Sequence, residues 1–569
     1  KVKSGRGGDI LHRRQIEVEN REVIDALDLS LSGKDIEGAR EHVLKERIAK
    51  NQGGKLRDVV ETMQPDQDEL MRVPASQPLV VQGPAGSGKT TLLLHRAAYI
   101  TASERERAQR EASGTLVLLP TGALVHAAAG VLQGLGANGV VTITPHSWVT
   151  RMLGQEKVRA EDRTLNLLLS DRNTKRQTWA WRRAKLLGEV RMLSVMRKHL
   201  ELRARAQLGQ LRSRDLTQDQ ILQSLEKTFQ SSRPWNAALR EALGEHLGSG
   251  HPEIERTISM LLGSATSTTE AQRLLTDAPS LERTELLNET EIQLLSPSIF
   301  ASGTASRMAS IDAAELGWAL CAQVILRGIS PGSMRPGSAK WDHILADEAQ
   351  DLSPLLIHLL SLATAPGQLS LVGDLDQGMH GYRGPSNWKQ ALDAINSAWP
   401  EHQQEAELRQ LTRAWRSTKQ IGIAAREAAG KMRVEGSTTG DREGTEVKFV
   451  KCTHQELSSA VAKLIKEAQS EGHVNIAVIT RSAISAERLP KELELHGIGA
   501  PYLSAAAAYQ GGLMVMDVSV AKGMEFGAVI TVSPENVKSE YERRLRYVML
   551  TRGLHWMACV ELTNADPHE

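Results

Sequence analysis

The sequence predicts an α/β protein with two series of parallel strands and helices, the first interrupted by a mainly helical insertion. Three observations lead to this prediction. The glycine-rich stretch Gly83 to Thr90 lies between an apolar run at 79–81 and a helix-forming segment. Apolar runs and helical segments alternate in both halves of the chain, a pattern typical of parallel sheets covered by helices. Between residues 147 and 335 the strand-like runs nearly vanish and long helical patterns replace them.

Length and composition narrow the class of protein. The chain has 569 residues, which is too long for one hydrophobic core. Its net charge of +1 neither supports nor excludes a nucleic-acid partner. The three cysteines are far apart in the sequence, and no apolar run reaches the ~18 residues of a membrane span. We therefore expect a protein of the reducing cytosol, without a membrane partner.

Five segments are expected in chain order. They are an N-terminal extension (1–60), a first α/β part with the glycine-rich loop (61–146), the helical insertion (147–335), the second part of the same domain (336–404) and a second α/β domain (405–569). In the extension, residues 11–29 read partly as a hairpin and partly as helix, and residues 37–50 as an exposed helix. Strands are expected at 79–81, 115–120, 140–145, 343–346, 369–373, 446–452, 475–480, 513–518 and 528–533.

The glycine-rich loop predicts a nucleotide site. Its G-x-x-x-x-G-K-T spacing lets backbone N–H groups surround a phosphate, and the helix that follows adds the positive end of its dipole. Lys89 would reach the β- and γ-phosphates, and the Thr90 hydroxyl would bind Mg²⁺. The alternative is a flexible loop that binds nothing. The expected nucleotide-binding residues of this stretch are Gly83, Gly86, Ser87, Gly88, Lys89, Thr90 and Thr91.

Acidic and amide side chains follow two further strands of the first domain. Asp347 and Glu348 come directly after the strand at 343–346, and Gln377 follows the strand at 369–373. Beside a phosphate-binding loop, the first acid is expected to hold Mg²⁺ and the second to polarise the attacking water. Gln377 could sense the γ-phosphate or position that water. With the loop, these residues predict hydrolysis of a nucleotide.

The second domain has no glycine-rich phosphate loop, but it carries arginines. We expect these to complete the site across a cleft, where they would stabilise transition-state charge.

Within the helical insertion, residues 172–214 contain 13 Lys and Arg, interleaved with Trp179 and Trp181, against the two acids Glu189 and Glu201. This pattern suits a nucleic-acid backbone with stacked bases. A solvated helical face, or a face that docks on an acidic protein, explains it equally well.

The motifs of the chain resemble those of superfamily 1 helicases of the UvrD/Rep/PcrA type. They run from Gln67 to Arg552 and include DEAQD at 347–351, VGDLDQ at 372–377, WRST at 415–418, AKGMEF at 521–526 and ERRLRYVMLTR at 542–552. The resemblance implies two RecA-like domains with ATP and Mg²⁺ in the cleft between them. It also implies DNA as a partner of the ATPase motor and a location in the bacterial cytosol or nucleoid.

The resemblance implies a role for each matching residue. At the phosphates it implies that Lys89, Thr90 and Asp347 bind phosphate and Mg²⁺, that Glu348 is the general base, and that Arg416 and Arg552 are arginine fingers. At the nucleoside it implies that Gln67 and Arg96 read the adenine edge, Trp415 stacks on adenine, and Glu525 contacts the ribose with Gly523 beside it. On the DNA side it implies that Gln377 links the γ-phosphate to the DNA site and that Tyr382 and Arg383 face single-stranded DNA. Each role has a structural alternative. Trp415 could belong to a hydrophobic core, and Arg383 could form a structural ion pair.

Three departures from the family pattern concern the DNA side rather than the nucleotide side. The large insertion that UvrD-like enzymes carry before AKGxEF is absent or vestigial. His380 and Tyr382 replace the usual Tyr and Trp, and residues 121–123 lack the usual DNA-contacting residue types. With the segment 55–67 and the helical insertion, this combination resembles the HelD or helicase IV-like branch.

HelD-type proteins use nucleotide-driven motion to free RNA polymerase from nucleic acid. Their N-terminal coiled-coil arm has no heptad counterpart in residues 1–60, so it either lies upstream of Lys1 or is lacking. We therefore expect an ATP-dependent motor that acts on DNA or DNA-bound complexes as a HelD-like factor that releases RNA polymerase. The alternatives are a conventional 3′–5′ single-stranded-DNA translocase or helicase of DNA repair, and a scaffold with a decayed ATPase.

Overall fold

The fold was analysed in a computed structural model. It describes residues 12–19, 22–31, 34–35, 64–108, 114–154, 160–170, 174–263, 271, 274–275, 277–295, 311–329, 334, 340–378, 381–413, 417–430, 442–504, 511–535 and 540–563. The helix expected at 37–50 lies outside this part of the chain. None of the described helices is long and apolar enough to cross a membrane.

The first parallel sheet has six strands. Their order is β11 (Glu407–Gln410), β4 (Leu79–Gln82), β10 (Leu369–Gly373), β9 (His343–Ala346), β5 (Thr115–Leu118) and β6 (Val141–Ile143). The helices of this part are α2 (Pro65–Met71), α3 (Lys89–Ala108), α4 (Gly122–Gly134), α5 (Pro145–Met152), α16 (Pro354–Leu362) and α17 (Trp388–Ala398). Because parallel strands end at the same edge of a sheet, the segments that follow β4, β9 and β10 come together.

The second parallel sheet has five strands. Their order is β12 (Lys448–Cys452), β16 (Gly553–Leu562), β15 (Phe526–Pro534), β13 (Ile476–Thr480) and β14 (Leu513–Asp517). Its helices are α18 (Lys419–Ala429), α19 (Leu457–Ser470), α20 (Ala483–Glu494), α21 (Val518–Ala521) and α22 (Glu540–Leu550). Two parallel sheets in one α/β chain confirm the predicted fold class of two RecA-like domains.

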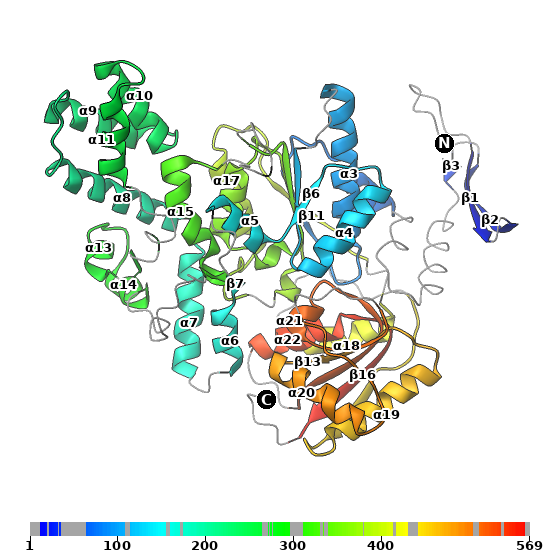
Figure 1. The fold of residues 1–569 in the computed structure, drawn as a ribbon. Coiled ribbons are helices and arrows are strands. Elements are labelled where there is room, and N and C mark those ends of the chain that lie inside the picture. Colours follow the sequence, from blue (N-terminus) through cyan, green and yellow to red (C-terminus); the bar gives the residue numbers. More distant parts are fainter. Residues whose placement is uncertain are drawn as a thin grey trace.

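The insertion between β6 and β9 is mainly helical, as predicted. It contains α6 (Arg163–Ser170), α7 (Thr174–Leu187), α8 (Met192–Leu208), α9 (Gln218–Gln230), α10 (Trp235–Leu247), α11 (Pro252–Leu262), α13 (Ala278–Glu282), α14 (Glu289–Leu295) and α15 (Leu316–Arg327). The two-residue strands β7 (Ala160–Glu161) and β8 (Ile311–Asp312) pair with each other and bring the early and late parts of the insertion together. Figure 1 shows α9, α10 and α11 at the end that points away from both sheets, while α6 and α7 lie on the side of the second sheet.

One hydrophobic core joins the insertion to the first sheet. The same cluster of buried side chains contains Val80, Leu116 and Ile344 of the strands and Leu239 and Trp318 of the insertion. The second sheet has separate clusters on its two faces. The insertion is therefore packed tightly against the first sheet.

Three elements differ from the sequence-based expectations. Residues 12–19 and 22–31 form a hairpin, β1 and β2, extended by β3 (Lys34–Asp35), so the helical part of the prediction for 11–29 is wrong. Strand β11 pairs with β4 of the first sheet, although the second domain was expected to begin at 405. Its four side chains are exposed, so backbone pairing places it there without an apolar pattern. Strand β16 was missed because it follows Arg552 and α22 with almost no turn signal.

Candidate active site

The glycine-rich loop forms a tight turn between β4 and α3. Gly86 and Gly88 have φ angles of 73° and 79°, which residues other than glycine rarely adopt. The Lys89 ammonium group donates hydrogen bonds to the backbone oxygens of Gly83 (2.8 Å) and Pro84 (3.0 Å). The Ser87 hydroxyl is buried and has no hydrogen-bond partner among the described residues. A buried hydroxyl without a partner, in a glycine-rich loop at the start of a helix, suits a phosphate oxygen.

Gln67 lies directly against this loop. Its side-chain amide donates to the backbone oxygen of Ser87 (2.7 Å), and the same side chain caps the start of α2 at Gln64. A Cβ atom on Gly88 would lie 2.6 Å from the Gln67 amide nitrogen, so only glycine fits beside it. The structure thus places Gln67 against the loop, and its role in reading the adenine edge stays a prediction.

Asp347 and Thr90 form the candidate Mg²⁺ site. The Thr90 hydroxyl donates to Asp347 Oδ2 at 2.6 Å, across 257 positions of sequence. Burial and the negative charge of Glu348 raise the pKa of Asp347 to about 6. A hydroxyl and a carboxylate oxygen are hard ligands, and Mg²⁺ needs few of them from the protein because water and phosphate supply the rest. The residues present therefore fit this ion.

Glu348 sits in a strained and positively charged setting. Its backbone φ of 52° lies in the left-handed region, which is uncommon for a residue with a side chain and costs ~1–3 kcal/mol. Burial alone would raise the pKa of Glu348, but the positive charges of Lys522, Lys89 and Arg552 outweigh it and lower the pKa below its usual value. The carboxylate also accepts a hydrogen bond from the Gln350 side chain. It is therefore held ionised, as a general base must be.

Arg552 of the second domain enters this site and contacts Gln377. The guanidinium group donates to the Gln377 amide oxygen, and Gln377 donates to Asp374 Oδ2 at 2.6 Å. Asp374 also accepts from Gln82 at the end of β4 (2.8 Å). A buried chain of hydrogen bonds thus connects the base of the phosphate loop with the second sheet. Two of its members, Gln82 and Asp374, were not among the predicted site residues.

Lys522 makes a second contact across the cleft and was also missed. Its ammonium group pairs with the Asp351 carboxylate, and both side chains are buried. Burial and the positive charge of Arg552 lower the pKa of Lys522 to about 8, while Glu348 opposes the shift. The sequence held a signal, because Lys522 lies inside the AKGMEF motif beside Gly523.

The remaining predicted residues of the second domain are placed as follows. A Cβ atom on Gly523 would lie 3.9 Å from Glu348 Oε1, so this glycine lines the same cleft. Glu525 is half-buried in the turn before β15. Trp415 and Arg416 lie outside the described residues, and their roles stay predictions.

Arg96 does not face the loop, which corrects the expectation that it reads the adenine edge. Its guanidinium group is buried and donates to the backbone oxygens of Met71 (3.0 Å) and Val73 (2.7 Å), and to the Ser370 hydroxyl (2.8 Å). Burial lowers the pKa of Arg96 to about 10. Arg96 therefore satisfies the carbonyl groups at the end of α2 and joins that helix to β10.

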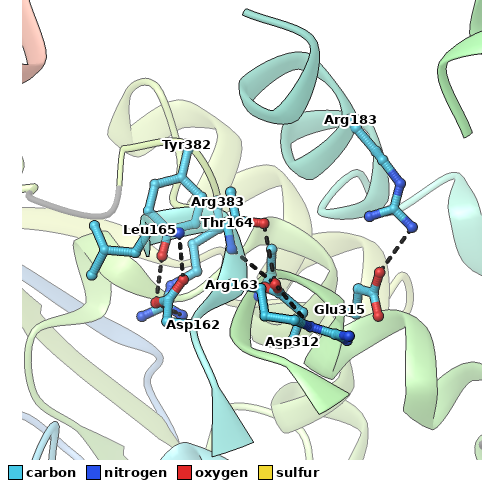
Figure 2. A network of polar contacts seen from close by, with 10 residues as sticks. Asp162, Arg163, Thr164, Leu165, Arg183, Asp312, Glu315, Tyr382 and Arg383 are labelled. Atoms are coloured by element: carbon cyan, nitrogen blue, oxygen red, sulfur yellow. Dashed lines mark hydrogen bonds and ion pairs between the residues drawn. The ribbon is translucent and has the colours of Figure 1, made fainter. Parts of the chain in front are cut away.

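Tyr382 is buried against the insertion and Arg383 pairs with a carboxylate of the insertion, which corrects the expectation that they face single-stranded DNA. The Tyr382 hydroxyl donates to Asp162 Oδ2 at 2.5 Å, and Arg383 forms an ion pair with the same oxygen at 3.3 Å. Figure 2 shows Asp162 beneath both side chains, with Asp312 and Thr164 beside it. The Tyr382 side chain has no exposed surface. The alternative of a structural ion pair for Arg383 is the one that the structure supports.

Much of the basic stretch 172–214 is used inside the insertion. Arg183 pairs with Glu315 at 2.8 Å, Lys198 and Arg205 pair with Glu201, and Arg191 pairs with Glu291. Arg197 donates to the backbone oxygen of Ser231 (2.9 Å). These contacts favour a structural role for the basic residues over a nucleic-acid surface.

Comparisons with known proteins add the following. A family model described as the UvrD/REP helicase N-terminal domain matches residues 63–395, more than half of the chain. None of the curated proteins compared with the chain matches it. Among solved structures, the C-terminal domain of a possible DNA helicase from Lactobacillus plantarum WCFS1 shares 25% identity. That match covers 27% of this chain and 91% of the other, with a TM-score of 0.23.

The carboxyl groups near Tyr382, those of Asp162 and Asp312, lead to a prediction about how the stability of the fold depends on pH. Burial, reinforced by Asp162 and Glu315, raises the pKa of Asp312 from 3.8 to about 7. Between these two values the folded state binds a proton that the unfolded state has lost, so stability falls as the pH rises. We expect Asp312→Asn to remove this part of the decline, because asparagine does not ionise.

The measurement is the free energy of unfolding in urea at about pH 5 and about pH 8 for wild type and Asp312→Asn. Wild type should lose more stability between the two values than the variant does. Asp393→Asn, at an exposed carboxylate on α17, is the control and should follow wild type. Parallel profiles for wild type and Asp312→Asn would contradict the assignment.

Proposed function

Because the chain belongs to the UvrD/REP helicase family, we propose that it is an ATP-hydrolysing motor that acts on DNA or on complexes bound to DNA. The observation that carries this proposal is the contact of Arg552 with Gln377 beside the phosphate loop. A site assembled from both sheets changes shape whenever the sheets change their separation. This is the property that couples a chemical step to mechanical work.

The chemistry follows from the side chains of the cleft. Loop N–H groups and Lys89 bind the phosphates, while Glu348 orients and polarises the attacking water. Arg552, together with Arg416, stabilises the negative charge that develops on the transferred phosphoryl group. Mg²⁺, held by Thr90 and Asp347, would neutralise phosphate charge when bound. Gln67 would recognise the adenine edge, Trp415 would stack on it, and Glu525 would contact the ribose.

We further propose that the motor serves a HelD-like factor that releases RNA polymerase. The burial of Tyr382 and the pairing of Arg383 with Asp162 occupy two side chains that a DNA-tracking enzyme would need at its surface. The insertion that buries them shares its core with the first sheet, so it is well placed to receive the motion of the motor. A conventional 3′–5′ translocase or helicase of DNA repair is the alternative, and a scaffold with a decayed ATPase is a weaker one.

Replacement of the general base tests the chemical assignment. Glu348→Gln should lower kcat for ATP hydrolysis by about 10²-fold or more, because the amide cannot accept the proton of water. ATP affinity should stay close to that of wild type. Steady-state hydrolysis and equilibrium titration with a fluorescent ATP analogue measure the two quantities. Glu494→Gln, at an exposed position on α20, is the matched control. Hydrolysis retained by Glu348→Gln would exclude Glu348 as the base.

The biological target is tested by comparing two partners. The purified chain is assayed for ATPase activity with single-stranded DNA at low and high salt, and for binding to bacterial RNA polymerase. The HelD-like proposal predicts binding to the polymerase, its release from DNA with ATP, and little stimulation by DNA alone. Strong stimulation by DNA that salt abolishes, without polymerase binding, would favour the translocase. Absence of any hydrolysis would favour the scaffold.

A further inference from the structure

The helix α22 reaches from the nucleotide cleft to the helical insertion. Two residues after its end, Arg552 contacts Gln377 in the cleft. In its first turn, Tyr541 packs edge-on against Trp181 of α7, with ring centroids 6.4 Å apart. The helix has 11 residues, so its two ends are about 16 Å apart. Because a helix of this length is rigid, displacement of one end displaces the other.

Trp181 lies between the two motor domains. Its ring contacts Tyr382 of the first domain as well as Tyr541 of the second, with a centroid separation of 6.2 Å to Tyr382. On the same helix, Lys185 donates to the backbone oxygen of Gly384 at 2.6 Å, which fixes α7 to the segment that follows Gln377. We call these contacts of Trp181 and Lys185 with Tyr382, Tyr541 and Gly384 the α7 joint.

The α7 joint has a small hydrophobic cluster of its own. It consists of Leu165, Leu168, Ala184, Ala314 and Tyr382, with Trp181 and Tyr541 packed against it. The insertion and the first sheet share a different, much larger core. The contact of α22 with the insertion therefore lies outside that core.

One buried polar atom at this contact has no hydrogen-bond partner among the described residues. It is the Tyr541 hydroxyl, on which the charges of Asp162, Arg383 and Arg481 act. An unpaired buried hydroxyl costs ~1–3 kcal/mol. The contact between α22 and α7 therefore carries an energetic cost that a change in their relative position would alter.

We propose that the helical insertion reads the nucleotide state of the cleft through α22, with Trp181 as the positioning residue that receives the displacement. The inference rests on the proposed ATPase function and adds the route by which nucleotide binding reaches the insertion. By thermodynamic linkage, a partner bound to the insertion changes nucleotide affinity by the same factor.

Hydrogen–deuterium exchange of the full chain tests the proposal. Exchange is measured with and without Mg²⁺ and a non-hydrolysable ATP analogue, at the phosphate loop (83–90) and at α7 (174–187). In wild type the analogue should protect the loop and change the exchange rates of α7 amides by at least about fivefold, the lower end of typical coupling between sites. In Trp181→Ala the loop should still be protected, while the response of α7 should be lost.

Matched variants separate coupling from damage to the fold. Trp179→Ala makes the same change on the same helix, at a ring that packs against Arg183, and should keep the α7 response. Trp181→Phe retains a ring at the joint and should restore the response. If Trp181→Ala does not fold, Tyr541→Ala carries the same prediction from the side of α22.

Three outcomes would overturn the inference. The first is a protected loop with an unchanged α7 in wild type, which leaves the proposed function intact. The second is a full α7 response in Trp181→Ala. The third is a loop that the analogue does not protect, which contradicts the proposed function itself.

Discussion

The candidate site depends on one hydrogen bond across the cleft, from Arg552 to the amide of Gln377. Through Asp374 and Gln82 this bond continues to the end of β4, where the phosphate loop begins. All four side chains are buried, so loss of one member leaves another without its partner. The network therefore favours a single placement of the two sheets, and a ligand that enters between them has to alter that placement.

The nucleotide half of the site could be predicted because its information is local. A strand, a glycine-rich turn and a helix occupy consecutive residues, and parallel pairing brings Asp347 and Gln377 to the same edge of the sheet. Lys522 and Asp374 could not be placed in this way, since their importance comes from partners that only the tertiary fold brings near. Arg96 was misread because a charged residue in an apolar helix gives no sign of whether it binds a ligand or backbone oxygens.

The expectation that Tyr382 and Arg383 face single-stranded DNA was wrong for a related reason. Tyr382 and Arg383 follow the expected motif, but their partner Asp162 lies 220 residues before Tyr382, inside the insertion. No local pattern reports such a contact. The result is an α/β motor in which side chains expected at a nucleic-acid surface instead hold the insertion in place.

A double-mutant cycle on the rate of ATP hydrolysis tests the central claim, that Gln377 and Arg552 act as one unit across the cleft. Arg552→Ala alone should lower kcat by about 10³-fold, and adding Gln377→Ala should lower it little further, because residues of one unit are not additive. The account is contradicted if the two losses multiply. It is also contradicted if Arg552→Ala raises KM and leaves kcat unchanged.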